Sequence, residues 1–419
     1  MIRIFLSIAY LLFSICAVSQ SITQNFPLSF TVQVSNPLNA SRDNVLIFIS
    51  NDQLKKKVNG FNSNAFVVMD GAKEIPSQFN SHDNDYPGIV FVLDALAAKE
   101  SKSILVRYNS TGLVKHNYTK RTQAELAHKE GGKFENREYI GGTFKNVDFL
   151  RVPPEHKDHS WFIRYEGPGW ESDKVGYRFY LDQRNATDVF GKKISEMVLQ
   201  NVGLDGFDSY HNLQPWGMDV MKVGKSLGVG SIGSVVNGTA VRVEKTDSVN
   251  CRIVENGNVY SSILTNYYGW QINNQKSDLH SRISIHAGTR LSHQQITVSG
   301  NPENISTGLV KDKAVPLQTN KGNDKQWAFM ATYGKQSLNT DGLGLAVLFN
   351  PKDVIEFMND ENSHIVKLKP TKGKLEYYFL AAWVGEPGGI QDEKQFMEYL
   401  NTVAMELSNP VKVEIQKTK

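Results

Sequence analysis

The sequence is poor in cysteine. Two of its 419 residues are cysteines, Cys16 and Cys251, and Cys16 falls in an N-terminal stretch that we expect to be removed. A single remaining thiol excludes an intramolecular disulfide framework, which a chain of this length does not need for a stable core. Cys251 lies in the alternating segment VRVEKTDSVNCRIVEN with no cysteine-rich metal spacing nearby. We interpret it as a small hydrophobic residue and not as a nucleophile.

A strong excess of charge is also missing. The chain has 46 lysines and arginines against 43 aspartates and glutamates, for a formal net charge of +3. This small value argues against a nucleic-acid-binding protein, which needs a strongly basic surface. It leaves room for a locally positive pocket that receives an anionic substrate.

Several well-known enzyme motifs are absent. The sequence contains no Walker loop and no His-Glu-x-x-His. Nucleotide-binding proteins with a Walker loop and metallopeptidases with the His-Glu-x-x-His motif therefore lose support as functional classes. Internal repeats, low-complexity tracts and charge blocks are missing as well.

One long apolar run stands at the start of the chain. Residues 1–19 combine the basic residue Arg3, the run IFLSIAYLLFSICAV and the small-residue ending Ala17-Val18-Ser19. This pattern predicts a cleaved signal peptide, and the run is too short for a stable membrane anchor, which is the alternative. We expect a periplasmic or secreted protein with no transmembrane segment after removal of the signal.

Strand patterns dominate the rest of the chain. Residues 26–110 contain five short runs of alternating residues separated by turn signals, which predicts a small immunoglobulin-like β-sandwich. The polar segment Thr111–Gln123 marks a domain boundary. Residues 124–415 continue in alternating runs almost to the end, and the best helix pattern lies at Asp392–Leu407.

The predicted fold is therefore mainly β, with a sandwich followed by a large antiparallel second domain that ends in a helix. So many strands in about 290 residues require two broad stacked sheets. By analogy this resembles the supersandwich of galactose mutarotases and of the C-terminal parts of several polysaccharide lyases.

The segment from Pro153 to Asp219 is unusually rich in histidines, arginines, carboxylates and aromatic residues. Charged residues are rarely buried unless they are paired, so such a large number of them cannot simply fill a core. The segment is either a solvated surface or a polar site ringed by aromatic side chains. Sugars bind to surfaces of the second kind, where rings contact the apolar face of the sugar.

His156 and His159 are three residues apart with acidic neighbours, a spacing that can serve a metal best on a helix. Because Pro153 and Pro154 precede them, we place the pair on a loop, either as solvated residues or with His159 in a catalytic or binding role. Neither a metal site nor a cofactor is predicted.

Two further groups of residues are candidates. Arg164 is predicted on a strand before a Gly-Pro-Gly turn that lifts Trp170 and Glu171 off the sheet edge. Side chains that alternate in facing place four residues on one face of the next strand, as a site or as an exposed charge ladder. These four are Arg178, Tyr180, Asp182 and Arg184.

The last group lies on the predicted loop at 205–219. Tyr210 and His211 are adjacent and can both transfer protons. Asp205 and Asp208 can hold calcium in principle, but the fuller set of loop ligands is missing. We therefore interpret Asp208 as a substrate-binding residue, together with Trp216.

Three motifs carry a resemblance: KRTQAEL, YIGGTFKNVDFLRVPPEHKDHSWFIRYEGPGWESDKVGYRFYLDQRNATDVFGKK and VLQNVGLDGFDSYHNLQPWGMDVMKVGKSLGVGSIG. They resemble the secreted bacterial family catalogued as domain of unknown function 4861, over most of the chain after the signal. The resemblance implies a gene that accompanies polysaccharide-utilisation gene clusters. It also implies removal of water from the non-reducing-end uronic acid of ulvan-type acidic oligosaccharides.

The roles of single residues are inferred from chemistry, since the resemblance supplies none. Elimination across C4 and C5 of a uronate needs a cation on the carboxylate, a base for the C5 proton and an acid for the C4 hydroxyl. The arginines are predicted to neutralise the carboxylate, and the base and acid are left unassigned among the other catalytic candidates. The predicted catalytic residues are His159, Tyr210, His211 and Arg164. The predicted substrate-binding residues are Arg178, Arg184, Trp170, Glu171, Trp216 and Asp208.

Two other classes of function compete with this one. A polysaccharide lyase or hydrolase on uronate-containing glycans would break the glycosidic bond. A non-catalytic glycan-binding or mutarotase-like protein would need only the aromatic surface. In each case the expected partner is an acidic oligosaccharide.

Overall fold

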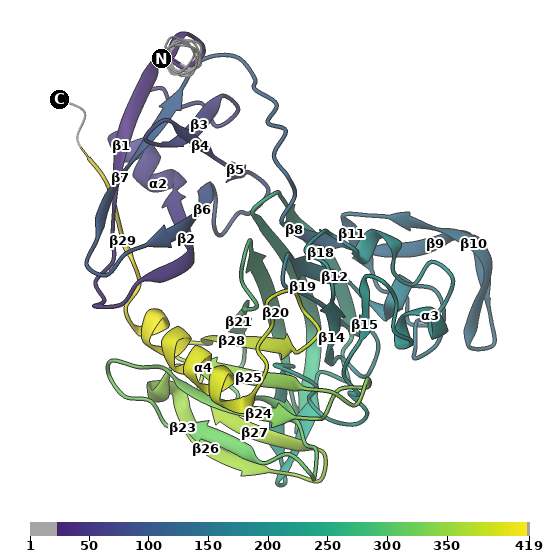
Figure 1. The fold of residues 1–419 in the computed structure, drawn as a ribbon. Coiled ribbons are helices and arrows are strands. Elements are labelled where there is room, and N and C mark those ends of the chain that lie inside the picture. Colours follow the sequence, from purple (N-terminus) through teal and green to yellow (C-terminus); the bar gives the residue numbers. More distant parts are fainter. Residues whose placement is uncertain (1–22, 417–419) are drawn as a thin grey trace, which may run out of the picture. The chain divides into compact units, whose positions relative to one another are not determined.

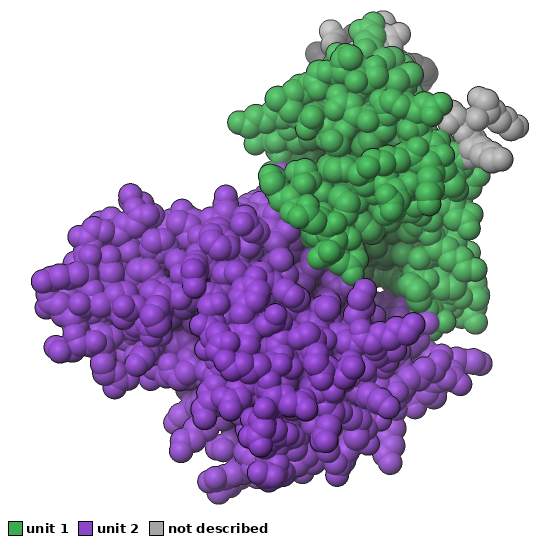
Figure 2. All heavy atoms as spheres, turned by 180° about the vertical axis from the view of Figure 1, so that it is seen from behind, with its two compact units in different colours: residues 1–119, 409–419 green, residues 120–408 purple. Residues whose placement is uncertain are grey.

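The structure, a computed structural model, describes residues 23–416, so the predicted signal peptide and Cys16 lie outside the described residues. The chain divides into two compact units, residues 1–119 with 409–419 and residues 120–408 (Figure 2). Both are built mainly of antiparallel strands (Figure 1). No helix within 23–416 combines the length and the apolar character that crossing a membrane requires.

The first unit is a two-sheet β-sandwich. One sheet has five strands in the order β29-β1-β7-β3-β4, and the other has three in the order β2-β6-β5. Its elements are β1 (Leu28–Ser35), β2 (Arg42–Ser50), α2 (Asn51–Lys57), β3 (Phe66–Asp70), β4 (Lys73–Ile75), β5 (Ser77–Asn80), β6 (Gly88–Leu96), β7 (Ser101–Tyr108) and β29 (Lys412–Ile415).

Alternation along the strands builds this core. In β1 every second residue is buried, and Val32 of one sheet packs in the same core as Ile47 and Phe91 of the other. The C-terminal strand β29 joins this sheet, where Ile415 pairs with Val32 and is buried. The sequence had placed residues 412–415 with the second domain. The structure gives them to the first unit because they complete an edge of its larger sheet.

The second unit contains a nine-stranded sheet in the order β11-β18-β19-β20-β21-β28-β25-β24-β23, two five-stranded sheets in the orders β15-β14-β13-β12-β8 and β17-β16-β22-β27-β26, and the hairpin β9–β10. Its strands are β8 (Thr122–Glu125), β9 (Ala127–Glu135), β10 (Glu138–Asn146), β11 (Phe149–Arg151), β12 (Gly169–Ser172), β13 (Val175–Phe179), β14 (Thr187–Lys192), β15 (Gly217–Asp219), β16 (Gly233–Val236), β17 (Thr239–Arg242), β18 (Ser248–Asn256), β19 (Tyr260–Ile272), β20 (Gln275–His286), β21 (Ser292–Val298), β22 (Ile305–Val310), β23 (Leu317–Asn320), β24 (Ala328–Gly334), β25 (Leu343–Phe349), β26 (Val354–Asn359), β27 (Ser363–Leu368) and β28 (Lys374–Trp383). Its helical segments are η1 (Arg164–Glu166), η2 (Leu199–Asn201), α3 (Asp208–His211), η3 (Pro351–Asp353) and α4 (Glu393–Ser408).

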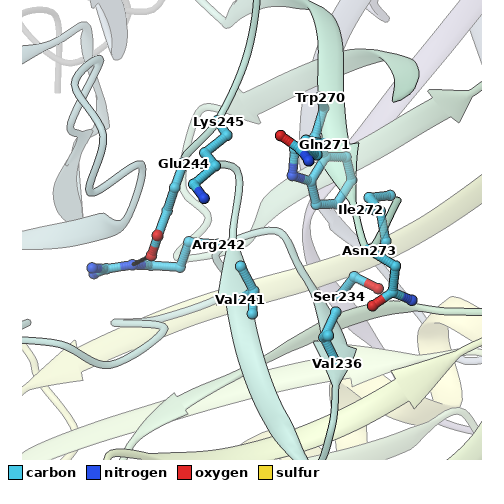
Figure 3. Close-up of a pocket in the computed structure, with 10 residues that line it drawn as sticks. All are labelled: Ser234, Val236, Val241, Arg242, Glu244, Lys245, Trp270, Gln271, Ile272 and Asn273. Atoms are coloured by element: carbon cyan, nitrogen blue, oxygen red, sulfur yellow. Dashed lines mark ion pairs between the residues drawn. The ribbon is translucent and has the colours of Figure 1, made fainter. Parts of the chain in front are cut away.

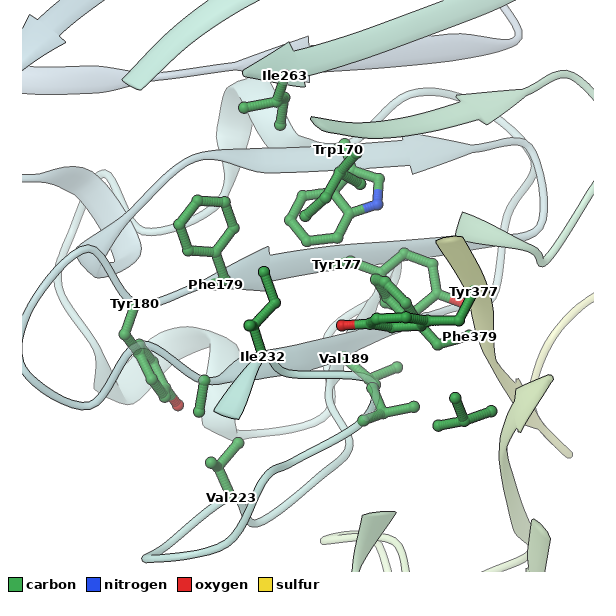
Figure 4. Packing of buried hydrophobic residues seen from close by; sticks show 14 of the residues in the cluster. Trp170, Tyr177, Phe179, Tyr180, Val189, Val223, Ile232, Ile263, Tyr377 and Phe379 are labelled. Atoms are coloured by element: carbon green, nitrogen blue, oxygen red, sulfur yellow. The ribbon is translucent and has the colours of Figure 1, made fainter. Parts of the chain in front are cut away.

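The large core of this unit draws on all three sheets. Trp170 and Tyr177 from one five-stranded sheet lie in the same cluster as Ile263 from the nine-stranded sheet and Leu309 from the other five-stranded sheet (Figure 4). Cys251 belongs to this cluster, and burial raises the pKa of its thiol to about 12, so the thiol stays protonated. The residue is a core hydrophobe and not a nucleophile.

The other face of the nine-stranded sheet is covered by α4. Strands β24 and β25 are apolar on both faces, so Met330 and Val347 enter the large core while Phe329 and Leu348 pack with α4. The helix begins and ends within one residue of the predicted segment. The prediction of a mainly antiparallel β-fold with a late helix is confirmed.

Candidate active site

Contacts between side chains bring three of the four predicted groups of residues together: the loop with His159, the group with Arg178 and Arg184, and the segment 205–219. Arg178 on β13 donates hydrogen bonds to Tyr210 on α3 and to Asp219 on β15. Arg184, in the loop after β13, lies 2.7 Å from Asp158 in the loop that precedes η1. The sheet β15-β14-β13-β12-β8 therefore gathers distant parts of the chain into one ionic cluster.

Arg178 is the centre of this cluster and is fully buried. Its Nη2 donates to Asp188 Oδ2 at 2.9 Å and to Asp219 Oδ2 at 2.6 Å, and its Nη1 donates to the Tyr210 hydroxyl at 3.0 Å. The guanidinium also lies 5.1 Å from the centre of the Tyr210 ring. Both terminal nitrogens are bonded inside the protein and its Nε is buried, so Arg178 holds the cluster together and does not face a substrate.

Asp188 has a strongly raised pKa. Burial, reinforced by the nearby charge of Asp219, raises the pKa of Asp188 to about 7. The Tyr180 hydroxyl donates to Asp188 Oδ2 at 2.6 Å. Near neutral pH this carboxyl is therefore protonated in a large fraction of molecules, which reduces the repulsion between the two aspartates around Arg178.

Glu166 connects Arg178 to Arg184. Its Oε1 lies 2.7 Å from Arg184 Nη2, and its Oε2 lies 3.7 Å from Arg178 Nη1. Arg184 also contacts Asp158 and Asp182, and its guanidinium stacks 3.9 Å from the centre of the Tyr180 ring. Both arginines are thus saturated by carboxylates of the protein itself.

His211 closes one end of the cluster at the surface. Its Nε2 lies 3.4 Å from Asp219 Oδ2, and 43% of its side chain is exposed while the aspartate is buried. The hydrogen bond to Asp219 raises the pKa of His211 above its usual value. The imidazole is accordingly a solvent-facing group that a buried carboxylate holds in position, with its protonated form favoured.

His159 closes the other end in a similar way. Its Nδ1 lies 2.6 Å from Asp158 Oδ1, its backbone N–H donates to Glu166 Oε1 at 3.0 Å, and 66% of its side chain is exposed. Its ring packs edge-on against Phe207, which in turn packs against Tyr210. The site therefore presents two histidine–aspartate pairs at the two ends of one ionic cluster.

The loop that carries His159 is held in a strained backbone conformation. Four of its residues other than glycine have positive φ: His159 (58°), Trp161 (60°), Tyr165 (37°) and Glu166 (71°). Side chains with a Cβ rarely adopt this region, and such residues persist only where surrounding contacts impose it. Here the bonds of Glu166 to Arg184 and to the His159 amide provide those contacts.

Three groups in this loop lie close enough to share a metal ion. One ligand atom each from Asp158, His159 and Glu166 falls within 4.8 Å of the others. The Arg184 guanidinium already contacts both carboxylates. It fills the position of a cation, and a metal would have to displace it.

Trp161, one of the aromatic side chains of the segment 153–219, lies on the accessible side of the site, and Lys129, which no sequence pattern indicated, lies beside it. Trp161 lies 4.0 Å from Phe207 between ring centres, and the Lys129 ammonium on β9 lies 5.7 Å above the Trp161 ring. Gly206 makes this approach possible, because a Cβ there would come within 2.6 Å of the indole at a φ of +117°. The only sequence signal was the aromatic density around Trp161, whereas Lys129 stands in an ordinary strand.

Arg164 needs a correction. It is not on a strand but begins the short helix η1, it is buried, and it forms an ion pair with Glu125. Its Nη1 donates to the Gln200 carbonyl at 3.0 Å, and Tyr165 also donates to Glu125. Arg164 is therefore part of a separate buried network and does not reach the two histidines.

The turn does not lift Trp170 and Glu171 off the sheet. Trp170 is buried, stacks on Tyr177 and donates from Nε1 to Ser292 Oγ at 2.8 Å (Figure 4). Glu171 is buried with Lys192 at 2.6 Å and accepts two backbone hydrogen bonds. Both residues stabilise the interior, since β12 pairs with strands on either side.

The remaining candidates divide between interior and surface. Tyr210 is buried, and burial raises the pKa of its phenol, so it keeps its proton and positions Arg178. Asp208 is exposed at the start of α3. Trp216 is partly exposed and packs edge-on against Phe190. Of the predicted sugar-contacting rings, Trp216 is the one that remains accessible.

Comparisons with known proteins identify one family. The sequence model described as "Domain of unknown function (DUF4861)" matches residues 34–413. A search of curated proteins finds no match. Two solved structures from Enterococcus faecalis are similar over 93% of this chain: a protein in the glycosyl hydrolase family 38 (9% identity, TM-score 0.43) and an α-mannosidase from strain V583 (8% identity, TM-score 0.46). The match spans 47% and 46% of those chains, so this chain is about half their length.

Proposed function

The chain belongs to the DUF4861 family, and we propose that it is a carbohydrate-active enzyme that removes water from the uronic-acid end of acidic oligosaccharides. One observation carries the proposal: the two histidine–aspartate pairs, His159 with Asp158 and His211 with Asp219, at the ends of one cluster. A histidine oriented by a carboxylate is a recurrent device for proton transfer. Two such groups provide the acid and the base that an elimination requires.

The raised pKa of His211 favours one assignment of the two roles. His211 has a raised pKa because of its hydrogen bond to Asp219, so it enters the reaction with a proton and acts as the acid for the departing C4 hydroxyl. His159, held by Asp158, takes the C5 proton. The electrons of the C5–H bond form the C4–C5 double bond, the C4–O bond breaks, and the hydroxyl leaves as water with the proton from His211.

The cation for the substrate carboxylate is reassigned from the arginines to Lys129. Arg178 and Arg184 are saturated by carboxylates, whereas no carboxylate partner for the Lys129 ammonium is found in residues 23–416. Lys129 is held over the Trp161 ring, close to the surface that His159 shares with Phe207. A neutralised carboxylate acidifies the C5 proton, which the elimination demands.

Aromatic rings provide the sugar-facing surface. Trp161 and Trp216 are both partly exposed at the cluster, one beside each histidine-bearing segment. Rings of this kind bind the apolar face of a pyranose. Ulvan-type oligosaccharides with a saturated uronate end are the proposed substrates.

The test uses purified protein, saturated uronate-capped oligosaccharides, ultraviolet absorbance and product mass. We expect enoate absorbance to rise while each product loses one water and keeps its length. His159→Ala and His211→Ala should each reduce turnover by about 100-fold or more. His280→Ala, an exposed histidine on β20, is the matched control and should retain the activity of the unaltered protein.

Other outcomes would support other functions. Absorbance with shortened chains would indicate a polysaccharide lyase, and shortening without absorbance a hydrolase. Binding without turnover on any acidic glycan would indicate a glycan-binding protein. Any of these results would overturn the dehydratase proposal.

Export of the protein belongs to the same proposal. The signal peptide at residues 1–19 would place the enzyme in the periplasm or outside the cell, where it would encounter its oligosaccharide substrates. Mass spectrometry of the protein purified from its native host should find the mature N-terminus near Gln20. An intact Met1 would contradict the prediction.

A further inference from the structure

A pocket in the same unit differs from the ionic cluster because some of its polar groups have no partner in the described residues. It has a volume of about 240 Å³ and lies where the hairpin β16–β17 meets the end of β19 (Figure 3). Val241 and Ile272 contribute apolar lining, while Lys245, Gln271 and Asn273 contribute side chains with ammonium or amide groups. Figure 3 shows Lys245 and Trp270 projecting from opposite sides toward the space above Val241.

A β-bulge directs Trp270 into this pocket. The register between β19 and β20 shifts between Tyr267 and Trp270, so both residues face the core although they are three apart. Gly269 has a φ of +64°, and a Cβ there would lie 2.1 Å from Asp247 Oδ2. Glycine at this position therefore permits the bulge, and the bulge determines which way the indole faces.

The indole N–H of Trp270 is left without an acceptor. Trp270 is only 1% exposed, and no hydrogen-bond acceptor for its Nε1 is found within residues 23–416. The nitrogen is not among the sealed side-chain atoms that lack a partner, so its edge opens to the pocket that the residue lines. A buried indole normally donates to some acceptor. Here the N–H is available to an acceptor in the pocket.

The charge of the pocket is positive. Glu244 is opposed by Arg242, whose Nε lies 3.7 Å from the glutamate, whereas Lys245 has no ion-pair partner in the described part of the chain. The Gln271 backbone amide donates to the Lys245 carbonyl at 2.9 Å, which fixes the backbone of Lys245 beside the indole. An apolar lining with convergent donors and one unopposed cation suits a sugar that carries one anionic group.

The pocket is also connected to the proposed active site. Asn185, the residue after Arg184, donates from its side chain to the Val243 carbonyl at 3.1 Å and accepts from the Tyr267 hydroxyl at 2.7 Å. Val243 separates Arg242 from Glu244, and Tyr267 stands at the start of the bulge. Asn185 therefore links the loop of Arg184 to the backbone of the pocket by two side-chain hydrogen bonds.

We propose that this pocket binds a sugar unit bearing a sulfate or a carboxylate, as a second subsite for the acidic oligosaccharide. The anionic group accepts from Lys245 and from the Trp270 indole N–H, while Gln271 and Asn273 bind hydroxyl groups. This subsite rests on the proposed function for its place in a reaction. Its binding of an anionic sugar does not depend on catalysis.

The experiment follows the indole ¹H–¹⁵N signal of Trp270, assigned with Trp270→Phe, in the His211→Ala protein. The probes are glucose 6-sulfate, glucuronic acid, glucose and inorganic sulfate. We expect a saturable shift with one or both anionic sugars, little with glucose, and a Kd raised about tenfold in Lys245→Met, as for the loss of one charge-assisted hydrogen bond. Lys352→Met, an exposed lysine outside the pocket, should bind like the parent protein.

Different results separate the two proposals. Absence of a shift with either anionic sugar, an equal response to glucose, a response to inorganic sulfate alone, or an unchanged Kd in Lys245→Met would overturn the subsite. Because the measurement uses the His211→Ala protein, it stands whether or not the enzyme is a dehydratase. Water loss from oligosaccharides by the unaltered protein, with no binding at the pocket, would leave the dehydratase proposal intact.

Discussion

The ionic cluster and the Trp270 pocket lie in the same unit but differ in whether their polar groups are paired within the protein. In the cluster, Arg178 and Arg184 are surrounded by carboxylates, and the two terminal histidines have the most exposed side chains of the ion pairs. In the pocket, the Trp270 indole and Lys245 keep donors without partners in the described chain. A dense set of charges can therefore be a structural element, while a sparse set with unused donors can be the better ligand site.

The largest expected effect concerns the centre of the cluster. Arg178→Met would leave Asp188 and Asp219 buried beside each other without their cation, so we expect the free energy of unfolding to fall by about 3–5 kcal/mol. Urea unfolding followed by tryptophan fluorescence measures this loss. Lys245→Met in the pocket is the counterpart and should change stability by less than about 0.5 kcal/mol. Equal losses in the two variants would remove the distinction between the regions.

The next effect separates function from stability within the cluster. His211→Ala removes an imidazole that is nearly half exposed, so the unfolding midpoint should stay close to that of the unaltered protein. Turnover of uronate-capped oligosaccharides should fall by about 100-fold or more. Parallel kinetics and urea unfolding on the same preparation measure both. Lost turnover together with a collapse of stability would make His211 a structural residue.

The pH dependence of turnover should follow the raised pKa of His211. As the acid, His211 must hold its proton, so the rate should decline as pH rises through that pKa. Asp219→Asn removes the charge that raises it and should move the decline to lower pH. In stability terms, the His211–Asp219 interaction is fully present below the unfolded histidine value of about 6.5 and is lost as pH rises through the folded pKa. A profile that is identical in Asp219→Asn would contradict this role.

The smallest effect belongs to the buried histidine of the strained loop. Burial lowers the pKa of His156, whose Nδ1 lies 2.8 Å from Ser160 Oγ, so the folded protein keeps this ring neutral. Its contribution to stability is therefore present above pH of about 6.5 and lost as the pH falls toward the folded value. His156→Gln should show a smaller fall in urea midpoint between pH 7 and pH 5 than the unaltered protein does. A fall of the same size would assign the acid sensitivity to other groups.

Sequence patterns predicted the fold well because the relevant signals are local. The alternation in β1 and the continuous apolar runs of β24 and β25 are set by the faces that each strand buries. The same patterns placed α4 to within one residue. The pairing of β29 with β1 was missed, because a four-residue strand carries no information about a partner some 380 residues away.

The site was predicted in part for a similar reason. The convergence of His159, Arg178 and His211 follows from their concentration in one segment of the chain. The sequence did not show which arginines are already paired with carboxylates of the protein. The partners of Arg164 and Arg178 are Glu125 on β8 and Asp219 on β15, both about 40 residues away along the chain. The sequence predicted Trp170 as a sugar-binding residue because it does not show which strands pair with β12. The pairing of β12 with β13 and β8 is what buries Trp170.

The position of β29 has a consequence for how the protein is made on the ribosome. Its strand completes an edge of the first unit's sheet, yet it is synthesised after every residue of the second unit. The emerging N-terminal sandwich must therefore wait with the β1 edge unpaired while nearly 300 residues are added, and unpaired edges invite association with other chains. Chaperones that bind nascent β-strands would find their target at Thr31–Ser35.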